Sequence, residues 1–230
     1  MLLRATRILA PHRKAEKVEP RADGVDDVDD VAAVVRHAYA NRASEYADVL
    51  GNMEATHVAD REFVLRWARR CGGPMIDAGC GPGHWTEFLR VAGNDVVGID
   101  PVPEFLAEAA LRYPDSVYRR AEMPNLGVAV NSLGGILAWY SLIHVPPAQM
   151  GEMLRDLASF LRPGAELALG FFEGASVEPF DHAVVTAYFW PVGELVGLLE
   201  DAGFEIVEVE SRADPGSRPH GAISARLTAR

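Results

Sequence analysis

Residues 75–89 read Met-Ile-Asp-Ala-Gly-Cys-Gly-Pro-Gly-His-Trp-Thr-Glu-Phe-Leu, and this stretch decides the fold of the 230-residue chain. The first four residues predict a buried strand, and the glycine-rich run 79–83 predicts a tight turn. The spacing of Trp85, Phe88 and Leu89 predicts a helix. A strand, a glycine turn and a helix in this order open a β–α–β unit, in which a ligand can approach the backbone unobstructed by side chains.

The same alternation continues along the chain. Further strands are predicted at residues 95–99, 117–118, 135–140 and 165–172. Helices are predicted between and after them, at residues 103–111, 146–160 and 191–202. Two segments of period-2 alternation, 207–210 and 223–228, predict a C-terminal antiparallel hairpin. The pattern therefore predicts an α/β fold with a mostly parallel sheet, helices on both faces and an antiparallel edge.

The N-terminal part of the chain differs from the rest. Residues 1–30 are expected to be a tail of uncertain order, because Arg4 and Arg7 interrupt the only apolar run that could serve as a signal peptide. Residues 31–230 are expected to form one domain, which opens with helices within 31–70.

Composition excludes several classes. A formal net charge of −11 argues against a nucleic-acid binder, and no apolar run is long enough to span a membrane. The only cysteines, Cys71 and Cys80, cannot build a disulfide framework or a four-ligand zinc site, so we expect a cytoplasmic protein without a metal. Arg69 and Arg70 are interpreted as a solvated helix end.

Two acidic residues indicate which ligand the glycine-rich turn binds. The dinucleotide fingerprint requires a sixth-position glycine where this chain has His84, and Pro82 removes one backbone donor. Asp77 would repel a pyrophosphate but attract the ammonium of a methionine moiety, which favours S-adenosylmethionine over NAD. Asp100 ends the next strand about 20 residues on, where a ribose diol binds. Either carboxylate has the alternative role of capping a helix.

These residues resemble the class I S-adenosylmethionine-dependent methyltransferases. Residues 75–89 look like motif I of that family, and 97–101 resemble its ribose-binding strand end. Residues 121–124 are similar to its adenine-side segment, and 135–147 to its fourth strand and following loop. The resemblance covers residues 35–228.

The resemblance implies seven strands in the order 3-2-1-4-5-7-6, with the cofactor across the carboxyl ends of strands 1, 2 and 4. It also implies that the helices within 31–70 form a lid carrying Tyr39 and Tyr46, for which packing beneath the lid is the alternative. The implied cofactor-binding residues are Tyr39, Tyr46, Asp77, Gly79, Cys80, Gly81, Gly83, Trp85, Asp100, Pro101, Ala121, Glu122, Met123, Trp139 and Tyr140.

The implied activity is transfer of the methyl group to an oxygen or nitrogen atom of a small or medium-sized acceptor, with S-adenosylhomocysteine as product. His144 is the candidate general base and acceptor contact, although a structural histidine is the alternative. Residues 172–191 are a candidate roof of the acceptor pocket, with His182, Tyr188 and Trp190 as candidate contacts; part of the core is the alternative.

The sequence also allows two other functions. The chain could be a catalytically silent S-adenosylmethionine-binding module that acts through a protein partner, because methyl transfer has no obligatory catalytic residue. An NAD-dependent oxidoreductase is the third candidate, against which Asp77 and the missing sixth glycine argue. The sequence carries no signal of oligomeric state.

Overall fold

A computed structural model of the chain describes residues 28–40, 42–182 and 184–229. The helices are α2 (Val28–Ala40), α3 (Ala43–Leu50), the short 3-10 helix η1 (Met53–Ala55), α4 (Val58–Arg70), α5 (His84–Val91), α6 (Pro103–Arg112), α7 (Pro147–Phe160) and α8 (Val192–Asp201). The strands are β1 (Met75–Ala78), β2 (Val96–Asp100), β3 (Val117–Arg120), β4 (Leu133–Trp139), β5 (Leu161–Glu173), β6 (Glu178–Phe180), β7 (Ala187–Trp190), β8 (Phe204–Arg212) and β9 (His220–Leu227).

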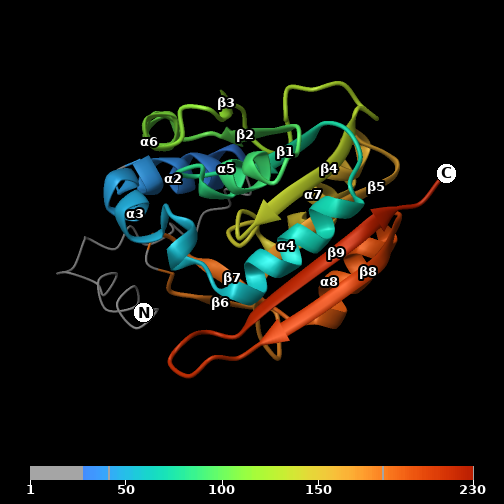
Figure 1. Cartoon of the computed structure of the whole chain (residues 1–230). Helices are drawn as coiled ribbons and strands as arrows, with labels where there is room; N and C mark the ends of the chain where they lie inside the picture. The colour runs from blue at the N-terminus through green and yellow to red at the C-terminus, as the bar shows by residue number, and fades with distance from the viewer. Residues whose placement is uncertain (1–27, 41, 183, 230) are drawn as a thin grey trace.

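The strands form one sheet, which confirms the predicted α/β class (Figure 1). Strands β3, β2, β1, β4 and β5 are parallel neighbours in that order, and β9 and then β8 follow antiparallel on the far edge of β5. Without β6 and β7, this is the predicted order 3-2-1-4-5-7-6. The predicted strand count was two short, because β6 and β7 lie within the segment 172–191, which was not predicted to contain strands.

The hairpin β6–β7 lies on the edge of β5 that β4 also uses. Phe172 of β5 pairs with His220 of β9 on one edge and with Phe189 of β7 on the other. The pairing of β4 with β5 ends at Trp139 and Gly170, so β7 continues along β5 where β4 stops. The hairpin therefore lies directly beyond the carboxyl end of β4.

Two hydrophobic clusters cover opposite faces of the sheet. Alternate strand residues such as Ile76 and Ile136 pack with α7 and α8, whereas their neighbours Met75 and Leu137 pack with α4 and α5. A third, small cluster joins α2 and α3 to Phe105 of α6. Alternation along each strand thus directs side chains to both helical layers.

The first described helix, α2, starts at Val28, three residues before the first residue of the predicted domain. Residues 1–27 of the predicted tail lie outside the described part of the chain. No helix among the described residues has the length and apolar character that a membrane crossing requires.

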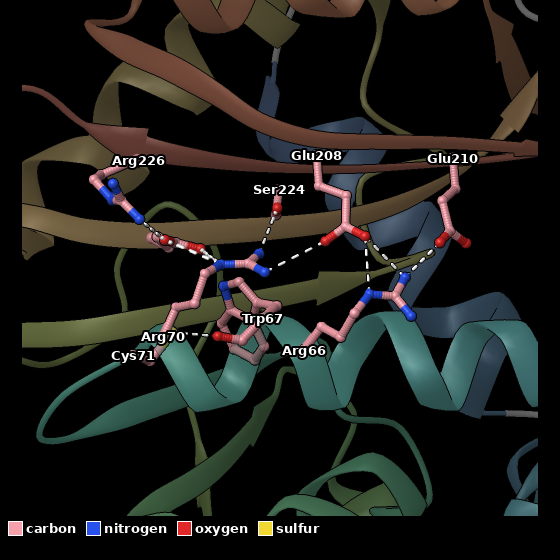
Figure 2. Close-up of polar contacts among 9 residues, drawn as sticks. Arg66, Trp67, Arg70, Cys71, Glu208, Glu210, Ser224 and Arg226 are labelled. Carbon is pink, nitrogen blue, oxygen red and sulfur yellow. Dashed lines mark hydrogen bonds and ion pairs between the residues drawn. The ribbon is translucent and has the colours of Figure 1, made fainter.

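Charged side chains fasten α4 to the hairpin β8–β9 (Figure 2). Arg66 is paired with Glu208 and Glu210. Arg70 is not simply solvated as expected: it bonds Glu166 of β5 at 3.0 Å and the hydroxyl of Ser224 at 2.8 Å. The basic end of α4 therefore belongs to a network across the sheet.

Candidate active site

The glycine turn between β1 and α5 closes against both neighbouring strands. Gly79 has a φ of +75°, and a Cβ atom there would lie 2.4 Å from the Cβ of Ser141, two residues after β4. In β2, a Cβ on Gly98 would lie 2.6 Å from the Oγ1 of Thr86 in α5. Only glycine permits these approaches, so the carboxyl ends of β1, β2 and β4 meet around the turn.

Each backbone N–H of the turn 79–83 has an acceptor inside the protein. The N–H groups of Gly79 and Cys80 both donate to the carbonyl of Ile99, at 2.8 and 2.9 Å. The N–H of Gly81 donates to Oδ2 of Asp100 at 2.9 Å, and that of Gly83 donates to the carbonyl of Cys80. Pro82 has no N–H. A phosphate site at such a turn needs free N–H donors, and this turn offers none.

Asp77 is a buried carboxylate directly before the turn. It is 2% exposed, and its Oδ2 accepts a hydrogen bond from the Thr86 hydroxyl at 2.7 Å. Burial raises the pKa of Asp77 to about 7, and the charge of Asp100 adds to this, against the opposing effect of Thr86. A cation placed beside such a carboxylate would stabilise its charged form.

Asp100 ends β2 and holds the turn. Its Oδ2 accepts from the N–H of Gly81, and its Oδ1 accepts from the N–H of Val102 at 2.8 Å, directly before α6. Burial raises its pKa to about 6, despite these two bonds. Asp100 thus links the turn to the residue before α6 without capping the helix, and each of its oxygens keeps a second lone pair for a ribose hydroxyl.

Two buried polar atoms near the turn have no hydrogen-bond partner among the described residues. They are Nδ1 of His84, the first residue of α5, and Oγ of Ser141. Burial lowers the pKa of His84 to about 4, so its ring is neutral. Unsatisfied buried groups are rare in proteins. They are consistent with a polar ligand that completes their bonds, which is what the methionine part of S-adenosylmethionine would do.

The lid helices bring an aromatic cluster to Asp100. The rings of Tyr39, Tyr46 and Phe105 lie 5.5–5.7 Å apart, centre to centre. Burial, with a smaller effect from Asp100, raises the pKa of Tyr46 to about 12. The packing alternative for both tyrosines is therefore realised, and their contact with a cofactor stays a prediction.

An ion pair ties the lid to the adenine-side segment. Arg36 of α2 donates to both oxygens of Glu122, at 3.0 and 3.1 Å. The neighbouring Ala121 and Met123 are partly buried against the main core. The lid and this segment thus lie side by side, as cofactor binding by both would require.

His144 connects the lid to the segment before β7. Its Nε2 lies 2.9 Å from the hydroxyl of Tyr39, and its Nδ1 lies 2.7 Å from the carbonyl oxygen of Thr186. The side chain is 8% exposed, and burial lowers its pKa. Its ring also contacts that of His182 at 5.3 Å. His144 is thus a neutral imidazole between the lid and the predicted roof.

Trp139 and Tyr140, which were both predicted to bind the cofactor, pack against different elements. Trp139 packs on Trp85 of α5, with ring centres 5.5 Å apart. Tyr140 has a φ of +56°, and its hydroxyl is bonded to Nδ1 of His220 in β9. The left-handed backbone of Tyr140 turns the ring toward β5 and β9, where it also contacts Phe172.

The residues predicted to form the roof of the acceptor pocket differ in how deeply they are buried. His182 and Tyr188 are partly buried, and the N–H of Tyr188 donates to the carbonyl of Ile143 at 2.9 Å. Trp190 is 3% exposed and belongs to the main hydrophobic core. The core alternative applies to Trp190, and we exclude it from the proposed acceptor site.

Sequence reasoning missed three partners in this region. They are Thr86, which bonds Asp77; the carbonyl of Thr186, which bonds His144; and His220, which bonds Tyr140. Thr86 lies nine residues after Asp77 in the quoted stretch, so the helix periodicity could have indicated it. The other two become neighbours only through the long-range pairing of β7 and β9 with β5. Within the described ranges, no cluster of His, Cys, Asp or Glu is arranged to hold a metal ion.

The fold and the glycine-turn site agree with those of the class I, S-adenosylmethionine-dependent methyltransferases. Residues 75–164 match the family model described as a methyltransferase domain. The 1,6-didemethyltoxoflavin N1-methyltransferase of Burkholderia thailandensis, solved with 1,6-didemethyltoxoflavin and S-adenosylhomocysteine, has the same fold. Its TM-score is 0.74 at 22% identity, covering 94% of this chain and 99% of that chain.

Curated relatives agree with this class. The chain is 26% identical over 211 residues to the ubiquinone biosynthesis O-methyltransferase of Xanthomonas axonopodis pv. citri, covering 82% of this chain and 87% of the relative. It is 24% identical over 149 residues to the malonyl-[acyl-carrier protein] O-methyltransferase of Erwinia billingiae, covering 65% and 57%. The chain spans about half to two thirds of the length of several of its curated relatives, one of which, from Eikenella corrodens, is named hemagglutinin 1. The match over residues 75–164 and these relatives support the predicted family and its cofactor, S-adenosylmethionine.

Proposed function

We propose that the protein transfers the methyl group of S-adenosylmethionine to an oxygen or nitrogen atom of a small or medium-sized acceptor. The observation that carries the proposal is the hydrogen bonding of the turn 79–83. Its N–H groups are all used internally, and the buried carboxylates Asp77 and Asp100 lie beside it. This arrangement suits a ligand with an ammonium and a ribose and without a pyrophosphate.

When bound, S-adenosylmethionine supplies a methyl group that its sulfonium already activates. The task of the protein is then orientation, which contributes up to roughly 7–11 kcal/mol in favourable cases. We assign the ammonium to Asp77 and the ribose to Asp100. The remaining predicted cofactor residues of the turn and the lid would enclose the same ligand.

We assign acceptor binding to His144 and the rings around it. His182 contacts His144, and the rings of Phe172 and Phe180 lie 6.1 and 6.2 Å from that of His182. The hairpin β6–β7 carries part of this surface beyond the end of β4. The relatives support a small acceptor, because the Burkholderia structure holds 1,6-didemethyltoxoflavin and the name of the Xanthomonas relative refers to ubiquinone biosynthesis. Their names include both O- and N1-methylation, so both atoms fit.

Calorimetric titration with S-adenosylmethionine, S-adenosylhomocysteine and NAD tests the cofactor assignment. We expect both adenosyl ligands to bind and NAD not to bind. In Asp100→Asn, which keeps one acceptor oxygen, adenosyl affinity should fall at least tenfold, because a charged hydrogen bond is worth roughly 1.5–3 kcal/mol. NAD binding without adenosyl binding would refute the proposal.

Turnover is tested with radiolabelled S-adenosylmethionine and a pooled metabolite extract. Label transferred to a small molecule supports the proposal. Adenosyl binding with no labelled product in extracts from several sources would instead favour a silent binding module. Label found only on protein or nucleic acid would contradict the small acceptor.

A further inference from the structure

The hydroxyl group of Tyr39 is hydrogen-bonded to the ring nitrogen of His144 that would act as the base. The Tyr39 hydroxyl of α2 is 2.9 Å from Nε2 of His144, in the loop after β4. These residues are 105 positions apart in the chain. The lid is therefore bonded to the candidate base, and the inference drawn from this contact rests on the proposed function.

The direction of this hydrogen bond follows from the other side of the ring. The Thr186 carbonyl, 2.7 Å from Nδ1 of His144, can only accept a hydrogen bond. Nδ1 therefore carries the proton of the neutral imidazole, and Nε2 carries the lone pair. Tyr39 must then donate to Nε2. An acceptor molecule cannot reach this lone pair directly while Tyr39 is in place.

The Tyr39 oxygen is itself able to accept a proton. No donor among the described residues is bonded to it, so its lone pairs are available to an O–H or N–H group. Its ring is fixed by Tyr46 and Phe105 on one side and by His144 on the other. The Tyr39 oxygen thus has a defined position between the aromatic rings of the lid and the acceptor site proposed around His144.

The groups facing this pair keep both partners neutral. Burial, then Tyr46 and Asp100, raise the pKa of Tyr39 well above its usual value. Burial lowers the pKa of His144 and that of His182, which falls to about 4. The cations near His182 are Arg42 and Arg218, which also lower its pKa. A free tyrosinate is therefore disfavoured, so Tyr39 must accept one proton and donate another in the same step.

We infer that Tyr39 relays the proton of the methyl acceptor to His144. As the acceptor atom forms its bond to the methyl carbon, the carbon–sulfur bond breaks and its electron pair stays on sulfur. The acceptor proton passes to the Tyr39 oxygen while the Tyr39 proton passes to Nε2. The resulting imidazolium keeps its Nδ1–H on the Thr186 carbonyl and later returns its extra proton to solvent. The acceptor class is thus a molecule with a weakly acidic O–H or N–H group.

The first test uses the protein without cofactor. Nitrogen-15 NMR of the His144 ring should show the Nδ1–H tautomer and a hydrogen-bonded Nε2. Tyr39→Phe keeps the aromatic ring and should shift Nε2 to the value of an unbonded imidazole nitrogen. Tyr46→Phe removes the neighbouring hydroxyl and should leave the His144 signals in place. An Nε2–H tautomer in the wild type would overturn the relay.

The second test follows methyl transfer to the pooled metabolite extract. In Tyr39→Phe, which keeps the aromatic ring that would enclose the cofactor, we expect the rate to fall roughly 10²–10⁴-fold, and adenosylhomocysteine affinity to change less than threefold. The solvent isotope effect of the wild type should show two protons in flight. Tyr39→Phe should lose this effect, and Tyr113→Phe, which removes a hydroxyl bonded to the Gly51 carbonyl, should keep it. Equal rates and isotope effects in wild type and Tyr39→Phe would refute the relay and leave the proposed function standing. Failure of the wild type to transfer label would refute the proposed function, while the NMR result still decides the contact.

Discussion

The guanidinium of Arg70 in α4 lies 3.0 Å from the carboxylate of Glu166, whose side chain in β5 is 2% exposed. Glu166 also accepts from Arg226 at 2.7 Å. Arg70 also donates to Ser224 (Figure 2). Removal of one partner leaves a buried charge less well compensated. This pair therefore secures α4 on the sheet face opposite α7 and α8.

Arg70→Met should lower the free energy of unfolding by about 1–3 kcal/mol, below the full cost of an orphaned buried charge because Arg226 remains. Its neighbour Arg69 is exposed, so Arg69→Met is the matched control and should change stability by less than about 0.5 kcal/mol. Urea denaturation of both variants measures the difference. Equal effects would show that the network contributes nothing beyond surface charge.

Gly79→Ala should destabilise the ligand-free protein more than Gly81→Ala. Both glycines have positive φ, and this alone costs alanine about 1–2 kcal/mol. Only at Gly79 would the new Cβ also collide with Ser141, whereas nothing lies within 4 Å of a Cβ at Gly81. We expect a further cost of about 1–3 kcal/mol at Gly79. Thermal unfolding checks this, and similar costs at the two positions would contradict the close approach of β4.

Asp77 makes stability depend on pH. Its pKa is about 7 in the folded protein and 3.8 in the unfolded chain, so the unfolded chain releases this proton first. The free energy of unfolding should therefore decline as pH rises from about 4 to 7. At pH 8, Asp77→Asn should be more stable than the wild type by on the order of 2–4 kcal/mol, yet bind S-adenosylmethionine at least tenfold more weakly.

The control for this prediction is Asp95→Asn, because Asp95 is exposed and lies directly before β2, the strand next to β1. It should shift neither stability nor affinity. Urea denaturation across the pH range, paired with calorimetry, gives both readouts. A wild-type stability that rises between pH 4 and 7 relative to Asp77→Asn would contradict the burial argument.

His144→Ala should separate catalysis from cofactor binding. Adenosylhomocysteine affinity should stay within about threefold, whereas the methyl-transfer rate should fall roughly 10²–10⁴-fold. Burial lowers the pKa of His144, so the wild-type rate should rise with pH through an inflection below 6.5, which the variant should lose. His37→Ala, at an exposed position of α2, is the control. A pH–rate profile shared by wild type and His144→Ala would make His144 structural.

Local patterns were sufficient for the elements that build the turn. β1 was predicted with its observed bounds, because an apolar run, a glycine cluster and a helical period follow one another in 15 residues. The start of β5 at Leu161 was missed: the strand was predicted to begin at residue 165, because proline followed by glycine at 163–164 is typical of the residues that follow a helix. Its pairing of Leu161 with Leu133, across a register shift, is visible only in the folded sheet.

The residues of the candidate site also fall into two groups: those that local sequence patterns predict, and those that only the folded chain brings together. Asp77 and Asp100 were predicted at strand ends that the structure brings together, because the carboxyl ends of parallel strands meet at one edge. The second bond of His144 and the pairing of Arg70 were not predictable, because each depends on a segment far away in the chain. Trp190 looked like part of the roof because aromatic residues surround it, yet β7 directs it into the core.

The proton on Nδ1 of His144 is held by a main-chain carbonyl, and every amino acid carries one. The identity of residue 186 is therefore free to drift during evolution without loss of this contact. What selection must preserve is the position of the main chain at residue 186, directly before β7. Substitution tables would rate position 186 as unimportant, whereas the pattern of insertions and deletions around it would record the constraint.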